Sequence, residues 1–168
     1  MAGEFDLILR YFSPPTRHTV LAGGDDAALL RVRAGMELAV STDMLVGGRH
    51  FLEDASAASI GHKALAVNLS DMAAMGATPR WVTLSIALPR SDERWVAEFA
   101  RGFLALAAEH DVDLIGGDTT RGPLNICVQI MGEVPSGQSL RRDGARAGDL
   151  VWVSGCVGEA ALALTSRL

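Results

Sequence analysis

The sequence lacks the features that mark several classes of protein. It has two cysteines in 168 residues, Cys127 and Cys156, which are far apart and show no Cys-x-x-Cys spacing. We therefore expect both to be reduced core residues, as is typical of a cytoplasmic protein. No apolar run reaches the ~18 residues that span a bilayer. The N-terminal stretch carries acids early and has no basic start, so we expect no signal peptide there.

The sequence also lacks an excess of positive charge. Its formal net charge is -5, which argues against a general nucleic-acid binder. Anionic ligands remain possible, because bound metal ions can reverse the local field. Hydrophobic residues make up 49% and charged residues 21%, which indicates a globular protein with a real core.

Hydrophobic periodicity predicts alternating helices and strands. Helices are predicted over residues 5–12, 57–75 and 91–110 and from residue 157 onward, and strands over 27–33, 37–43, 81–88, 112–115, 124–134 and 150–154. Ser91 is the predicted N-cap of the third helix. This order predicts an α+β (mixed α/β) fold, with a mixed, largely antiparallel sheet and helices on one face.

The pattern also predicts how the chain divides into domains. Its last residues, AALALTSRL, form an apolar helical pattern with no glycine or cap at the end. We therefore expect residues 1–150 to form an N-terminal domain and residues 151–168 to begin a C-terminal domain that continues beyond this sequence.

Several aspartates lie next to or within apolar segments, at positions where a hydrophobic core would not normally contain a carboxylate. The stretch GGDDAALL holds Asp25 and Asp26 side by side, with no basic residue within four positions; the others are Asp43, Asp71 and Asp118. A buried carboxylate without a partner is costly. One such acid could cap a turn or face water. Several of them, each near Gly, Ser, Thr or Asn, favour one shared cation.

Magnesium suits these residues best, because it prefers carboxylate, hydroxyl and water oxygens. In an extended strand Ser41 and Asp43 point to one face, and Thr42 offers a further oxygen. Asn68 and Asp71 are three apart and share a face of a helix. Each acid alone could still be a turn, cap or solvent-facing residue, and their joint occurrence is what favours a metal site.

Glycine-rich and basic segments could bind an anion. Residues 116–122, GGDTTRG, follow a predicted strand, and glycines there would let backbone N–H groups approach phosphate. The Walker ending Gly-Lys-Ser/Thr is absent. Arg141 and Arg142 could reach a phosphate, and His50 in a glycine-containing loop could orient a substrate. Surface positions for these three side chains remain equally open.

Taken in order, several segments resemble the thiamine-monophosphate kinases. This family shares a superfamily with aminoimidazole ribonucleotide synthetase and selenophosphate synthetase. The matching segments cover nearly the whole chain: GEFDLILRYF, GGDDAALL, STDMLVGGRHF, HKALAVNLSDMAAMGATPRW, LIGGDTTRGP and RRDGARAGDLVWVSG.

The resemblance implies an enzyme that transfers the γ-phosphoryl group of ATP directly to thiamine monophosphate, making thiamine diphosphate. It implies a homodimer in which two N-terminal sheets join into a barrel-like core, and a cleft that holds ATP and several Mg²⁺ ions. Such chains are about twice as long as this one. We therefore expect the metal and ATP half of the site here, and doubtful turnover by this chain alone.

The resemblance also implies residue roles. Metal ligands would be Asp26, Ser41, Thr42, Asp43, Asp71 and Asp118; ATP contacts would be Gly117, Asp118 and Arg142; and His50 would contact the thiamine substrate. Asp25 would support Asp26, although the sequence does not separate the two. No general base is expected, because the acceptor is an ionised phosphate.

Two alternatives stay open. The first is another ATP-using enzyme of the same superfamily with a different acceptor, such as formylglycinamidine ribonucleotide. The second is a non-catalytic dimerisation module whose acids are turn and cap residues. The number of metal ions and any need for a monovalent cation are open as well.

Overall fold

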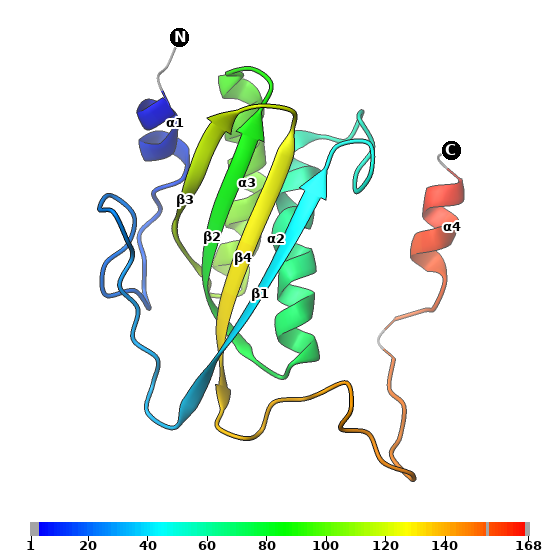
Figure 1. Ribbon diagram of the computed structural model, residues 1–168. Helices are drawn as coiled ribbons and strands as arrows, with labels where there is room; N and C mark the ends of the chain where they lie inside the picture. The colour runs from blue at the N-terminus through cyan, green and yellow to red at the C-terminus, as the bar shows by residue number, and fades with distance from the viewer. Residues whose placement is uncertain (1–3, 154, 167–168) are drawn as a thin grey trace.

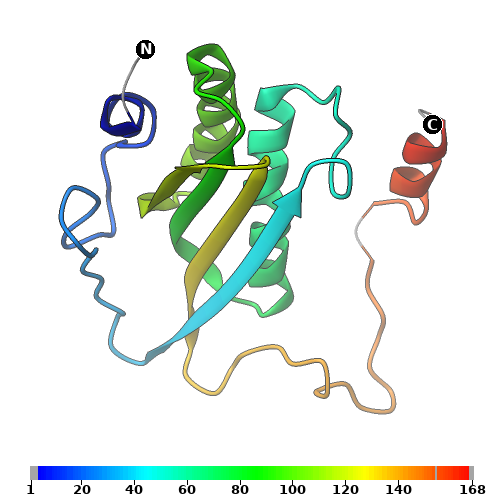
Figure 2. The same ribbon diagram turned by 45° about the horizontal axis from the view of Figure 1, so that its top comes forward.

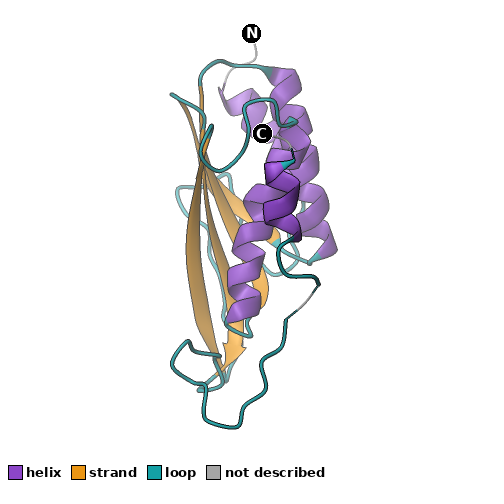
Figure 3. Cartoon of the chain, turned by 90° about the vertical axis from the view of Figure 1, so that its right-hand side faces the viewer, coloured by secondary structure: helices purple, strands orange, loops and turns teal. Residues whose placement is uncertain are grey.

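A computed structural model describes residues 4–153 and 155–166, in which a four-stranded sheet is covered on one face by helices (Figure 3). The elements in chain order are α1 (Glu4–Tyr11), β1 (Met36–Val46), α2 (Ala57–Ala74), β2 (Thr78–Leu88), α3 (Glu93–Glu109), β3 (Asp113–Arg121), β4 (Asn125–Pro135) and α4 (Glu159–Thr165).

The sheet has the strand order β1-β4-β2-β3 (Figure 1). β4 pairs antiparallel with both β1 and β2, whereas β3 runs parallel to β2. The parallel pair is joined through α3, as a crossover connection requires. The predicted fold class is confirmed: the sheet is mixed, mainly antiparallel, and has its helices on one face.

The main core lies between the sheet and helices α2 and α3. Strand side chains such as Leu84, Ile86 and Val128 meet Phe99 and Phe103 of α3 there. The two helices approach closely through glycines. A Cβ on Gly102 would collide with the carbonyl oxygen of Ala58, and one on Gly61 with that of Phe99.

A long irregular segment, residues 12–35, runs from α1 to β1 beside the β3 edge of the sheet (Figures 1 and 2). Asp113, which is 4% exposed, fixes its first part. That carboxylate accepts hydrogen bonds from the backbone N–H groups of Arg17 and His18, at 2.8 and 2.6 Å, and from the Thr19 hydroxyl at 2.7 Å.

Glu133 of β4 fixes the other end of this segment. Its buried carboxylate accepts the Arg33 backbone N–H at 2.8 Å and the Arg33 Nε at 2.6 Å, and Arg80 Nε lies 3.5 Å away. Burial alone would raise the pKa of Glu133, but the Arg33 hydrogen bonds and the two positive charges outweigh burial and hold that pKa below its ordinary value.

The predicted strand 27–33 does not form. Ala28 and Leu30 pack against Trp81 on the face of the sheet away from the helices, which explains the alternating pattern. The segment has one isolated bridge, Leu21 with Leu29, and the Arg33 backbone N–H bonds a side chain instead of a strand. An alternating pattern predicts which side is buried, but not whether a neighbouring strand is present.

Other boundaries also differ from the predictions. Residues 150–153 form no strand, and Ser154 lies outside the described residues. Asp92 rather than Ser91 caps α3, because its carboxylate accepts the Trp95 N–H at 3.1 Å. The expectation that both cysteines lie in the core is wrong: Cys127 is half-buried and Cys156 is exposed.

Beyond β4 the chain leaves the sheet. Residues 141–153 are exposed, and no other helix or strand of the described part packs on α4 (Figure 2). Apolar side chains stand open there, including Trp152 at 86% and Leu162 at 72% exposure. Among the described helices, none is both long and apolar enough to cross a membrane.

We predict that Gly102→Ala destabilises the protein by about 2 kcal/mol or more, because the added methyl group must push α3 away from α2. This outweighs the ~1 kcal/mol that alanine gains over glycine in a helix. Urea unfolding measures the change. Gly122→Ala is the control, since its Cβ would make an ordinary contact with Ala87; equal effects of both changes would contradict the close packing.

We predict that Glu133→Gln costs about 2 kcal/mol at neutral pH, since it removes charge-assisted hydrogen bonds. A lowered pKa in the folded state adds stability above the ordinary value of 4.5, and this is lost as pH falls through the folded pKa. The gap between wild type and variant should therefore shrink in urea titrations below about pH 4.5. A gap that stays constant down to acid pH would show that the charge of Glu133 adds nothing.

Candidate functional site

The clearest contact between predicted site residues joins β1 to α2. The hydroxyl of Ser41 donates to a carboxylate oxygen of Asp71 at 2.5 Å. Both side chains are half-buried at the β1 edge of the sheet. This contact joins two segments 30 residues apart and brings two hard oxygen donors together.

Strand alternation places the neighbours of Ser41. Leu45 is buried against the helices, so Ser41 and Asp43 share its face, as predicted. Thr42 points to the opposite, open face, where its hydroxyl lies 3.4 Å from Gln129 Nε2. The side chain of Asp43 takes part in no hydrogen bond or ion pair within the described residues.

Asp25 and Asp26 lie in the irregular segment, residues 12–35, that Asp113 and Glu133 fix in place. Both aspartates are exposed, and Asp25 accepts the backbone N–H of Asp26 at 2.9 Å. The preceding Gly24 has φ +118°, a conformation that favours glycine. Asp25 thus shapes the turn, while the Asp26 carboxylate has no hydrogen bond or ion pair in the described part of the chain.

Asp118 lies in β3, because that strand continues through the glycine pair to Arg121. The predicted end of this strand at residue 115 is wrong, because residues 116–121 continue it. A Cβ on Gly117 would overlap the Leu84 carbonyl oxygen, so close approach of β2 explains this glycine. Asp118 pairs with Ser85, whose neighbours in β2 face the helices. Asp118 is therefore on the open face.

The predicted metal ligands form two groups within one chain. Ser41, Asp43 and Asp71 lie at β1, whereas Asp118 lies on β3 and the Asp26 turn is beside it, since Gly23 approaches Ile115 and Gly116. β1 and β3 are opposite edges of the sheet. No three His, Cys, Asp or Glu residues of the described ranges are close enough together to hold a metal ion.

His50 and Arg142 lie toward opposite ends of α2, on either side of Asp71 along the helix. His50 Nδ1 accepts the Val46 N–H at 3.0 Å, and Lys63 of α2 binds the His50 carbonyl. Arg142 is exposed and lies two residues after Leu140, whose N–H donates to the carbonyl of Met75 at the end of α2 at 3.0 Å. Arg141 pairs with Asp143 at 2.9 Å, which leaves Arg142 as the accessible guanidinium of the pair.

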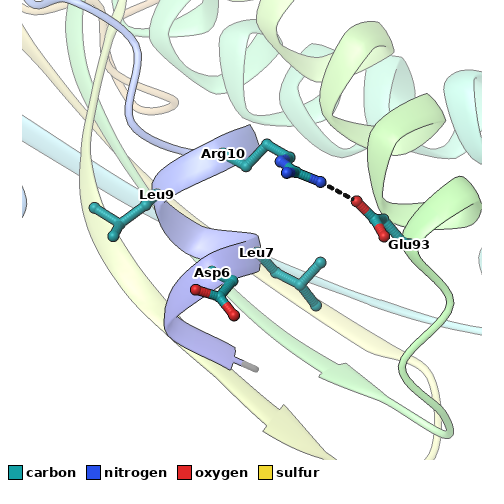
Figure 4. A pocket seen from close by; sticks show the side chains of 5 residues that line it. All are labelled: Asp6, Leu7, Leu9, Arg10 and Glu93. Atoms are coloured by element: carbon teal, nitrogen blue, oxygen red, sulfur yellow. Dashed lines mark hydrogen bonds and ion pairs between the residues drawn. The ribbon is translucent and has the colours of Figure 1, made fainter. Parts of the chain in front are cut away.

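Two hollows lie elsewhere on the surface. One, of about 570 Å³, is lined by Asp6, Leu7, Leu9, Arg10 and Glu93 (Figure 4). Tyr11 and then Arg10 bind Glu93 and hold the pKa of its carboxyl below the ordinary value. The other, of about 390 Å³, is lined by Glu53, Leu88, Pro89, Arg90, Asp92, Trp95 and Leu124. Neither contains a predicted site residue.

Sequence reasoning missed the residues that position the Asp26 turn. Asp113 and Glu133 are acids inside apolar strands, which is the signal that drew attention to the other aspartates. They differ in having three donors or cations each, supplied mainly by residues 17–33. Those donors are too far away in sequence for spacing to reveal them.

Comparison with known proteins gives one family. The family model of the AIR synthase related protein, N-terminal domain, matches residues 24–134. Thiamine-monophosphate kinase of Salmonella typhimurium is 50% identical over 165 residues, covering 96% of this chain and 51% of that protein. Its counterpart in Haemophilus influenzae is 43% identical over 169 residues, covering 99% and 52%. The chain spans about half the length of the curated relatives it matches.

Solved structures agree with this result. Thiamine-monophosphate kinase from Stenotrophomonas maltophilia is 54% identical with a TM-score of 0.83, over 89% of this chain and 48% of that one. AaThiL complexed with AMPPCP and TMP is 32% identical with a TM-score of 0.73, over 98% and 53%. The resemblance drawn from the motifs is confirmed, and the chain belongs to the AIR synthase related protein family, whose N-terminal domain it carries.

Proposed function

We propose that the whole protein transfers the γ-phosphoryl group of ATP to thiamine monophosphate, and that this chain supplies the metal- and nucleotide-binding half of the site. Similarity to thiamine-monophosphate kinases over 96% of the chain supports the reaction. The main structural support for the proposed site is the contact between Ser41 and Asp71, with Asp43 on the same face of β1 as Ser41.

The donor set fits Mg²⁺. This ion is usually held by one or two carboxylates together with water and substrate phosphates. Asp43 and Asp71 supply two carboxylates and Ser41 a hydroxyl, whereas the Thr42 hydroxyl lies on the opposite face of the strand. Bound Mg²⁺ would screen the charge of the triphosphate and of the acceptor phosphate.

The chain's own residues would then position the two phosphate groups. The carboxylates of β1 and α2 would fix the nucleotide. Arg142 lies beyond the C-terminal end of α2, and its guanidinium can pair with a phosphate. His50 would contact the thiamine. An ionised phosphate oxygen needs no general base, so positioning and charge neutralisation supply the catalysis.

We predict that Asp71→Asn and Asp43→Asn each lower phosphate transfer by at least about 100-fold, because each removes charge from the ion site. Calorimetry with a non-hydrolysable ATP analogue should show binding that needs Mg²⁺ and disappears with EDTA. Glu109→Gln, an exposed acid at the end of α3, is the control. Absence of Mg²⁺-dependent binding by the wild type, with stability of both Asn variants unchanged with and without Mg²⁺, would favour the alternative of a non-catalytic module.

A panel of acceptors tests the other alternative. Radiolabelled ATP is offered with thiamine monophosphate or with formylglycinamidine ribonucleotide, using the full-length protein and this chain in parallel. Label on thiamine alone supports the kinase. Robust transfer by the 168-residue chain would show that it holds the whole acceptor pocket.

We infer that the protein is a homodimer that pairs the open faces of two sheets into a barrel-like core. Leu38, Val40 and Met44 alternate along β1 on that face and are 44%, 53% and 54% exposed. A stable monomer rarely leaves such a row in water. Pairing β1 of one copy with β3 of another would bring the edge that carries Asp26 and Asp118 of the second copy to the edge that carries Asp43 and Asp71.

Residues 151–168 would begin the second domain. The sheet ends at Pro135, and the apolar side chains of Trp152, Val157 and Leu162 have no partner in the described part of the chain. The rest of a protein twice this length would cover them. We also propose a cytoplasmic location. Fractionation of cells that produce the tagged protein tests it.

We predict that Val40→Lys converts the dimer to a monomer, because it places two charges in the apolar interface. Sedimentation velocity measures the mass, and the ATP-analogue titration is repeated on the same sample. Nucleotide binding should be lost together with the dimer. Leu9→Lys, at a 71% exposed site on α1, is the control; a monomeric Val40→Lys protein that binds nucleotide normally would refute the shared site.

A further inference from the structure

Asn68 in α2 has a buried acceptor without a donor. Its side chain is 0% exposed, and its Nδ2 donates to the Ala64 carbonyl at 2.9 Å. Its Oδ1 has no partner; among the described residues, the other such buried atom is Nε1 of Trp81. An unsatisfied buried carbonyl is costly, so this position calls for a donor that arrives in another state of the protein.

The packing of α2 places Asn68 at the level of Ser41 along β1. Met72, one helical turn further on, lies against Gly132 of β4, with its sulfur 2.9 Å from where a Cβ on Gly132 would sit. Gly132 pairs with Ala39 of β1. Met72 is therefore at the level of Ala39, and Ser41 lies two residues further along the strand.

The direction of the helix fixes the remaining step. α2 runs opposite to β1, because Lys63 reaches the loop after β1 while Asp71 reaches Ser41. Four residues back along a helix is about 6 Å, and two residues forward along a strand is about 7 Å. The distance from Met72 to Asn68 thus matches the distance from Ala39 to Ser41, so Asn68 is at the level of Ser41.

Two acceptors of α2 therefore lie at the level of one hydroxyl of β1. Ser41 donates to Asp71 at 2.5 Å, and Asn68, three residues before Asp71, is left without a donor. A cation on the Asp71 carboxylate would compete with the Ser41 proton for the same oxygen. Asn68 then becomes the better acceptor, and rotation of the Ser41 O–H toward Asn68 turns a lone pair of the Ser41 oxygen toward the cation.

We propose that Asn68 is a positioning residue for the divalent-cation site, accepting the Ser41 hydroxyl proton when the cation occupies Asp71. The proposal rests on the proposed function, because it needs a cation at Asp71. No covalent bond changes; one hydrogen bond moves from Asp71 to Asn68. The amide orients Ser41 without touching the nucleotide.

The test compares wild type, Asn68→Leu and Met72→Leu in the full-length protein. Leucine keeps the branching of the asparagine side chain and removes the unpaired oxygen, so stability to urea in EDTA should stay unchanged or rise. Mn²⁺ binding, followed by the loss of the free-ion electron paramagnetic resonance signal with a non-hydrolysable ATP analogue present, should weaken at least about 10-fold.

Met72→Leu changes packing on the same face of α2 and should leave Mn²⁺ binding unchanged. Asn68→Asp keeps an acceptor oxygen, so it should retain Mn²⁺ binding even if it lowers stability in EDTA. Wild-type Mn²⁺ affinity in Asn68→Leu would overturn the proposal, as would equal losses in Met72→Leu. Absence of binding by wild type would instead overturn the proposed function.

Discussion

The arrangement of this domain depends on which carboxylates have positive partners or hydrogen-bond donors within the chain. Asp113 and Glu133 are buried, and donors from residues 17–33 satisfy them. Asp26, Asp43 and Asp118 have no such partner in the described ranges. A cation from outside can neutralise these carboxylates, whereas the buried pair have partners within the chain. The same chemical group thus fixes the fold at two positions and is left available at three others.

Much of the fold follows from periodicity, because burial on one face imposes it. Helices α2 and α3 and strand β2 were predicted within a few residues, since each has a long, regular apolar pattern. Residues 27–33 were predicted wrongly for a physical reason. An extended segment that packs two side chains against Trp81 alternates in the same way as a paired strand.

The site was predictable as a set of residue types rather than as a geometry. Alternation correctly separated Ser41 and Asp43 from Thr42, and the meeting of Ser41 with Asp71 agrees with the metal hypothesis. No local pattern indicated that Asp118 would lie on the strand furthest from β1. Strand order depends on pairing between distant segments, which such a pattern does not encode.

Strand order also supports the proposed dimer. β1 is an edge strand of 11 residues with exposed apolar side chains on one face, and such edges normally require cover. β3 is the other edge and carries Asp118. Joining unlike edges of two copies would cover both strands and unite the two groups of acids. One contact would then serve stability and the ion site together.

The path of the chain after β4 suggests where the rest of the protein lies. Leu140 is tied to Met75, four residues beyond Asp71, so the chain leaves the domain at the same end of α2 as the Ser41–Asp71 contact. Arg142 follows two residues later, and the apolar residues from Val151 onward are open to a partner. Under the proposed function, a second domain attached there would lie on the Asp71 side of the nucleotide, while the His50 loop lies toward the other end of α2.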